Sequence, residues 1–440
     1  MPNMLKNFVF PTGMMIDSHL PYVYNNCIVA KQDAPIGCWR NKMSYNFDQV
    51  INRWNSSCEK YDMIAEKGYP HDMIPLWVAD MDFAAPECVK NALREVVDRG
   101  VFGYSHCSDA YYAAVSGWFS RRYGWAIDRS WIIQTPGVVT ALSAAVRVAT
   151  EPGDAVLIQS PVYHQFFNVV NRNGRRVVEN PLKYENGAYT MDLEDMERKI
   201  VENNVHFFIL CSPHNPVCRV WSPTELQKVG EICRKHDVTI MSDEIYCDFF
   251  SPGYKHTPFA VACPDLTDRL IVSVSPSKSF NTAGLQISNI VVPGEALRAK
   301  FQQAIGMVGY NNCNYMGMIA TQAAYEGGEE WLEACKAYIW ENAQYVQDFM
   351  AKRLPQIHVV EPQGTYLMWL DCSGLGLSAE ELEEMILHKA NIWPDIGTKF
   401  GEKTGQFVRL ALACPRSVLA EAMERLEKAI HATCATPATV

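Results

Sequence analysis

Six short apolar runs constrain the fold of this chain more than any other feature of its sequence. They lie at residues 131–134, 155–159, 205–211, 239–243, 270–275 and 288–292. The runs are continuous rather than alternating, which is typical of strands in a sheet that is covered on both faces. Helical stretches separate them, and one is marked by a capping box from Ser222 to Glu225. Strand–helix alternation predicts a mainly parallel α/β sheet whose ligand lies beyond the carboxyl ends of the strands.

The last quarter of the chain predicts a smaller domain. A long helical stretch at 329–353 is followed by short strands at 357–360, 365–370 and 407–413 and by a closing helix at 417–430. We therefore predict a large domain at 96–328 and a small α+β domain built from residues 43–95 and 329–432. Residues 1–42 are expected to be a poorly ordered leader, and residues 433–440 a frayed tail.

One lysine follows directly on a predicted strand. Lys278 comes three residues after Ser275 and one after Ser277, at the end of the run 270–275. A surface lysine is the commonest alternative, but the apolar run before it argues against a solvated loop. A lysine held in this way is typical of enzymes that bind pyridoxal 5'-phosphate (PLP). Its amine links covalently to the cofactor's aldehyde, and the nearby hydroxyls hydrogen-bond the phosphate.

Two more strand ends carry polar residues that suit the same cofactor. Asp243 closes the run 239–243, and a carboxylate beside the ring nitrogen of PLP stabilises its protonated form. A helix N-cap is the alternative for Asp243. Tyr246 and Asn215 are donors suited to the phenolic oxygen of the cofactor, and an Asn–Pro turn is the alternative for Asn215.

A glycine turn after the first strand predicts a phosphate site. Gly137, Val138 and Val139 lie between the run 131–134 and an alanine-rich helix. Such a turn presents free backbone N–H groups and the positive end of the helix dipole, which favour an anion.

The order of these sites along the chain is that of fold-type I PLP enzymes. The chain resembles the MalY/PatB-type cystathionine β-lyases, C–S β-lyases related to the class I/II aminotransferases, over about residues 43–430. The motifs that carry the resemblance are Tyr45-Asn-Phe-Asp48, Leu76-Trp-Val-Ala-Asp-Met-Asp-Phe83, Gly100-Val-Phe-Gly-Tyr104, Ser277-Lys-Ser-Phe-Asn281 and Arg409-Leu-Ala-Leu-Ala-Cys-Pro-Arg416. It implies a PLP-dependent transferase-like large domain with a mainly parallel, seven-stranded sheet.

The resemblance also implies roles for residues outside the cofactor motifs. Arg409 would bind the substrate α-carboxylate, with a surface salt bridge as the alternative, and Ala79 would lie against the substrate. Tyr163 would stack on the cofactor ring. Tyr104 would reach the phosphate in the partner subunit, which implies a homodimer.

The implied reaction is β-elimination from an amino acid substrate. L-cystathionine or a related cysteine S-conjugate would give pyruvate, ammonia and a thiol. Gln286 stands where many related aminotransferases carry an arginine to the phosphate, which favours the lyase. An aminotransferase that uses the same residues, and a PLP-binding regulator that acts through a protein partner, stay open as alternatives. Trp393 and Pro394 depart from the family's substrate-side loop and leave the substrate's size open.

Composition narrows the class of protein. The formal net charge is −10 without a basic run, which disfavours a nucleic-acid partner. Fifteen cysteines without a Cys-x-x-Cys pair predict reduced thiols in a cytoplasmic protein rather than disulfides or a metal site. Cys211 and Cys247 flank the proposed site and are interpreted as small core residues. No apolar stretch approaches the ~18–20 residues of a membrane span.

Overall fold

A computed structural model describes residues 45–434 of the chain. The predicted leader, and the part of the predicted tail from residue 435 onward, lie outside the described residues. Within residues 45–434, no helix is both long and apolar enough to cross a membrane.

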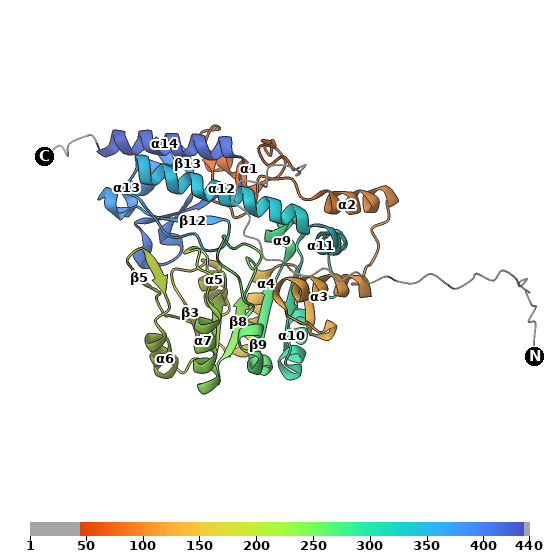
Figure 1. The fold of residues 1–440 in the computed structure, drawn as a ribbon. Coiled ribbons are helices and arrows are strands. Elements are labelled where there is room, and N and C mark those ends of the chain that lie inside the picture. The colour runs from red at the N-terminus through yellow and green to blue at the C-terminus, as the bar shows by residue number, and fades with distance from the viewer. Residues whose placement is uncertain (1–44, 435–440) are drawn as a thin grey trace, which may run out of the picture. The chain divides into compact units, whose positions relative to one another are not determined.

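The larger sheet has seven strands and confirms the predicted α/β fold (Figure 1). In spatial order they are β2 (Ile132–Thr135), β10 (Ser288–Val291), β9 (Leu270–Val274), β8 (Thr239–Asp243), β7 (Phe207–Cys211), β3 (Ala155–Ile158) and β4 (Arg176–Glu179). β10 runs antiparallel to both of its neighbours, and the pairs from β9 to β4 are parallel. All six predicted runs form strands. β4 was not predicted, because it is an edge strand with a charged residue at each end.

Helices cover both faces of this sheet. Phe207 and Ile209 of β7 pack in one core, whereas Phe208 and Leu210 pack in the other, and all four side chains are buried. The first face is covered by α4 (Val138–Ala149), α5 (Gln165–Arg172) and α10 (Glu295–Met307). The second is covered by α3 (Asp109–Tyr123), α6 (Leu193–Glu202), α7 (Pro223–Lys235) and α8 (Phe259–Ala262). Burial on both faces explains the continuous apolar runs. α7 begins with the predicted capping box.

The smaller sheet has four strands. In spatial order they are β11 (His358–Val359), β12 (Leu367–Asp371), β15 (Phe407–Ala411) and β14 (Asp395–Ile396). The long helix α12 (Glu329–Arg353) and the last helix α14 (Arg416–Cys434) run above it in Figure 1. The helices and three strands predicted here are confirmed, and β14 was not predicted.

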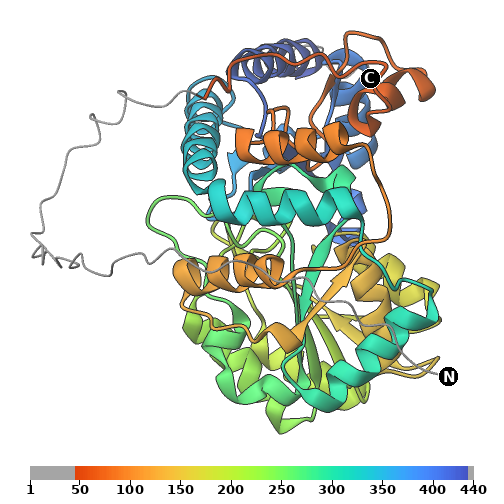
Figure 2. The same cartoon turned by 90° about the vertical axis from the view of Figure 1, so that its right-hand side faces the viewer.

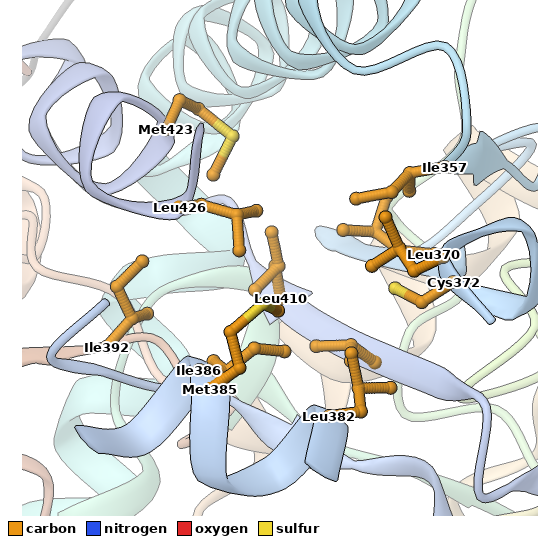
Figure 3. A pocket seen from close by; sticks show the side chains of 12 residues that line it. Ile357, Leu370, Cys372, Leu382, Met385, Ile386, Ile392, Leu410, Met423 and Leu426 are labelled. Carbon is orange, nitrogen blue, oxygen red and sulfur yellow. The ribbon is translucent and has the colours of Figure 1, made fainter. Parts of the chain in front are cut away.

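An apolar core joins the small sheet to its helices. Figure 3 shows that side chains from β12, β15, α13 (Ala379–Glu384) and α14 converge, among them Leu410, Met423 and Leu426. The space between them is about 10 Å³. A water molecule needs roughly 10–15 Å³ of such space and several polar partners. This gap is therefore a packing defect and not a ligand site.

The N-terminal elements contact β13 (Ile392–Trp393) and α11 (Tyr315–Gly327). α1 (Glu59–Glu66) is followed by β1 (Ile74–Pro75), which pairs in parallel with β13. Figure 2 shows α2 (Glu87–Arg99), α11 and α3 lying one above the other. Other elements are the hairpin of β5 (Lys183–Glu185) and β6 (Ala188–Thr190), the single turn α9 (Pro276–Ser279) and several short helical turns. The domain boundaries near residues 95 and 328 stay a prediction.

Gly397, in the loop after β14, should not tolerate a side chain. A Cβ atom there would overlap the carbonyl oxygen of Thr404 and lie 2.7 Å from that of Phe407. Because both obstacles are backbone atoms, Gly397→Ala should lower the free energy of unfolding by about 1–3 kcal/mol, as overpacking does. Urea denaturation measures the change.

Gly306 is the matched control for that substitution. It is exposed within α10, and a Cβ atom there would meet nothing within 4 Å. Gly306→Ala should raise the free energy of unfolding by about 0.5–1 kcal/mol, because alanine favours the helix. Equal effects of the two substitutions would contradict the packing argument.

Candidate active site

A cavity of about 650 Å³ lies where the carboxyl ends of the large-sheet strands meet the small sheet. Most of the residues predicted from the sequence line it. They are Ala79, Gly137, Val138, Val139, Tyr163, Asn215, Asp243, Tyr246, Ser277, Lys278 and Arg409. Two predicted residues do not line it: Ser275 lies behind the wall, and Tyr104 is fully exposed elsewhere on the surface.

Lys278 sits on α9, immediately after β9. Its Nζ donates a hydrogen bond to the carbonyl oxygen of Ala79 at 2.6 Å. Burial lowers the pKa of the Lys278 amine to about 8; Arg409 also lowers it, whereas Asp80 and Asp243 act in the opposite direction. The site therefore makes this amine a far better nucleophile and base near pH 7 than an ordinary lysine.

Asp243 is buried at the end of β8. Its Oδ1 accepts hydrogen bonds from Ser273 Oγ at 3.1 Å and from the backbone N–H of Ile245 at 3.3 Å. Burial raises the pKa of the Asp243 carboxyl to about 6. Within residues 45–434, its Oδ2 makes no hydrogen bond, so this oxygen is available to a cationic N–H group in the cavity.

The N-terminus of α4 provides an anion site. Gly137 is its N-cap and offers no side chain, so the first backbone N–H groups, including those of Val138 and Val139, lack intrahelical partners. Ser277 and Gln286 line the same cavity. Ser275 instead caps α9, accepting from the Ser277 N–H at 3.1 Å, while its hydroxyl lies 2.9 Å from the carbonyl oxygen of Ile287. Its position supports Ser277 rather than a ligand.

Arg409 is almost completely buried on β15. It donates to Asn215 Oδ1 at 3.0 Å and to the Trp77 carbonyl oxygen at 2.8 Å, and it pairs with Asp395. Its Nε–H is buried and has no hydrogen-bond partner among the described residues. Arg409 also lines the cavity, and the surface salt-bridge alternative does not fit its burial.

Asp395 and Lys399 were missed in the sequence. Asp395 lies on β14 directly opposite Arg409, and its other carboxylate oxygen accepts from Lys399 Nζ at 2.7 Å. Because β14 has two residues and follows Pro394, it gives no strand pattern. In the sequence, Asp395 is marked only as a polar residue that precedes the apolar Ile396.

Aromatic rings form the rest of the wall. Tyr163 and Tyr246 are largely buried, and burial raises the pKa of Tyr163 to about 12 and that of Tyr246 further. Both phenols therefore stay protonated and can donate hydrogen bonds. Trp77 stacks on Trp393 with ring centroids 4.6 Å apart. Trp393, which departs from the family's substrate-side loop, therefore supports Trp77 in the cavity wall.

Comparisons with known proteins agree with this geometry. Residues 71–426 match the family "Aminotransferase class I and II". The chain is 42% identical to cystathionine beta-lyase PatB of Bacillus subtilis, over 88% of this chain and 100% of PatB. It is 31% identical to protein MalY of Escherichia coli, over 88% of this chain and 99% of MalY.

The chain belongs to the class I and II aminotransferase family. Among solved structures, that of cystalysin from Treponema denticola, which contains pyridoxal 5'-phosphate, matches with a TM-score of 0.86 and 37% identity. The match covers 89% of this chain and 100% of cystalysin. The predicted resemblance to MalY/PatB-type lyases is confirmed.

The donor set in the cavity fits PLP, the cofactor expected from this family. Lys278 would hold the aldehyde carbon and Asp243 the ring nitrogen, whose positive charge the free Oδ2 can accept. Asn215 and Tyr246 offer donors for the phenolic oxygen, and the α4 N-terminus offers N–H groups for the phosphate. These assignments stay predictions for the individual residues.

The pKa of Lys278 predicts how fast cofactor-free protein takes up PLP. Only the neutral amine attacks the aldehyde, and with a pKa of about 8 about a tenth of it is neutral at pH 7, against about one in a few thousand for an ordinary lysine. The rate constant should rise about tenfold from pH 6 to 7 and level off above 8. Stopped-flow absorbance measures it.

Two variants check the sign of this effect. Asp80→Asn removes an anion that raises the pKa of Lys278, so the midpoint should move to lower pH. Arg409→Met removes a cation that lowers this pKa, so the midpoint should move to higher pH. A midpoint near pH 10 in the unmodified protein would contradict the role of burial.

Proposed function

We propose that this chain is a PLP-dependent C–S β-lyase that cleaves L-cystathionine or related cysteine S-conjugates. One observation carries the proposal: Lys278, Asp243 and Arg409 line a single cavity in a chain that aligns with PatB over the full length of PatB. A base, a carboxylate for the cofactor ring and a cation for the substrate are the groups that this reaction needs.

Arg409 binds the α-carboxylate of the substrate. Its side chain lines the cavity, and its bonds to Asn215 and to the Trp77 carbonyl hold the guanidinium in place. An arginine fixed by other bonds loses little freedom when it binds a carboxylate, which favours orientation of the substrate.

Lys278 acts as the general base on the Cα proton. In the cofactor-free protein its pKa of about 8 already lies nearer to neutral pH than that of an ordinary lysine, and general acid–base catalysis contributes ~10²–10⁴-fold to the rate. PLP, when bound, delocalises the electron pair left at Cα, and Asp243 stabilises the positive charge on its ring nitrogen.

The electron pair then expels the thiolate from Cβ. The C–S bond breaks, the thiolate takes up a proton, and the unsaturated remainder takes up one water molecule and ends as pyruvate and ammonia. For L-cystathionine the thiol is homocysteine. Transamination needs the same residues and differs only in where the proton returns, so it is the competing outcome.

A homodimer is part of this proposal. Tyr104 is 100% exposed, its sequence neighbours Val101 and Phe102 also expose large apolar side chains, and so do Met307 and Val308. Exposed apolar residues of this kind mark interaction surfaces. Tyr104 of the partner subunit would then donate to the cofactor phosphate.

The described cysteines are free thiols, which fits a reducing cytoplasm.

Reaction choice tests the lyase proposal. With L-cystathionine we expect pyruvate, ammonia and homocysteine in equal amounts, because thiolate is a good leaving group. With L-alanine and 2-oxoglutarate we expect far slower formation of glutamate. Coupled assays for pyruvate and glutamate measure both. Faster turnover of alanine than of cystathionine would favour the aminotransferase.

Subunit mixing tests the role of Tyr104. Tyr104→Ala and Lys278→Ala should each be nearly inactive as pure dimers, for different reasons. Mixed dimers should regain part of the activity, because one of their two sites combines an intact Lys278 with an intact Tyr104 from the other subunit. Light scattering confirms the dimer. No recovery in verified mixed dimers would show that Tyr104 does not cross between subunits.

A further inference from the structure

The cavity holds a second cation that the reaction at Cα and Cβ does not use. Lys399 lines it, on the loop that follows β14, and its side chain is 44% exposed. One of its three N–H groups goes to Asp395, and among the described residues its Nζ makes no other hydrogen bond. Two donors of a charged amine therefore face outward from the ion pair.

Lys399 is held close to the arginine that binds the substrate. Asp395 pairs with Lys399 through Oδ1 and with Arg409 through Oδ2. Trp77 lies beside both cations. Its carbonyl oxygen accepts a hydrogen bond from Arg409 at 2.8 Å, and Lys399 Nζ lies 5.9 Å from the centroid of its ring. Since both cations bond to one carboxylate at hydrogen-bond distance, their nitrogens lie within roughly 8 Å of each other.

This arrangement is more than a surface ion pair. Lys399 offsets the charge of Asp395, so the three groups together keep one net positive charge. The stacked Trp77 and Trp393 fix one wall beside the amine. A lysine on a rigid aromatic wall, beside the α-carboxylate site, is suited to a second anionic group on the same ligand.

We propose that Lys399 binds a carboxylate at the distal end of the substrate, so that the protein selects cysteine thioethers whose S-substituent is acidic. The inference rests on the proposed function and names the substrate class of that site. Glu59 also lines the cavity. A distal group that carries both charges, as in cystathionine, therefore finds a counter-charge for each.

A pair of unreactive ligands tests the subsite without any turnover. Adipate and hexanoate differ only in a second carboxylate. Calorimetry on the PLP-loaded protein should show that adipate binds on the order of tenfold more tightly, the effect of one charge-assisted hydrogen bond. In Lys399→Gln the two should bind alike, and Lys399→Arg should restore part of the preference.

Lys403→Gln is the matched control. Lys403 is exposed on the same stretch of chain but does not line the cavity, so its removal changes the net charge equally and should keep the preference. Equal binding of the two ligands by the unmodified protein would overturn the proposal. A preference that survives in Lys399→Gln would overturn it too.

Turnover then separates this proposal from the lyase itself. S-(2-carboxyethyl)-L-cysteine should give a kcat/KM about tenfold above that of S-propyl-L-cysteine, and Lys399→Gln should remove this advantage by lowering the first far more than the second. An equal loss for both would mean that Lys399 acts solely through Asp395 and Arg409, which overturns the subsite. If neither compound yields pyruvate, the lyase proposal fails, and the adipate-to-hexanoate ratio still decides the subsite.

Discussion

The irregular segment 76–83 fixes the distance between the two halves of the site. On one side, its backbone bonds to the small sheet and the residues after it, through Ala411 N–H to the Leu76 carbonyl and Asp82 N–H to the Ala413 carbonyl. On the other side, its Ala79 carbonyl accepts from Lys278. Buried backbone groups must have partners. The hydrogen bonds that satisfy this segment therefore also tie Lys278 to the small sheet that carries Arg409.

Buried charges hold the same segment and tune its chemistry. Lys60 Nζ lies 2.7 Å from Asp82, and both side chains are almost completely buried; Arg53 pairs with Asp80 and Asp82. Removing one partner of such a pair leaves an unpaired buried charge and costs about 3–5 kcal/mol. Asp80 also raises the pKa of Lys278 against the effect of burial. The stability of the segment and the pKa of the Lys278 amine thus depend on one cluster of charges.

The sequence located the cavity-lining residues of the large sheet better than those of the small one. Continuous apolar runs identify strands buried on both faces, and a polar residue at the end of such a run must lie at the sheet's ligand edge, which located Asp243 and Lys278. Ser275 caps α9 and does not line the cavity, because a serine after a strand can cap the next helix as well as bind a ligand. Asp395 and Lys399 lie on a two-residue strand and the turn after it, where neither periodicity nor turn chemistry indicates a site.

The two sheets contribute different kinds of groups to the cavity. The large sheet supplies groups whose pKa values burial has moved toward neutrality from opposite directions, the Lys278 amine to about 8 and the Asp243 carboxyl to about 6. The small sheet supplies Arg409, and the register of β14 on β15 places Asp395 opposite it. Without Lys399, Asp395 would cancel the positive charge of Arg409. Lys399 leaves one net positive charge on the three groups and, because it lines the cavity, is in a position to bind a second anionic group of the same ligand.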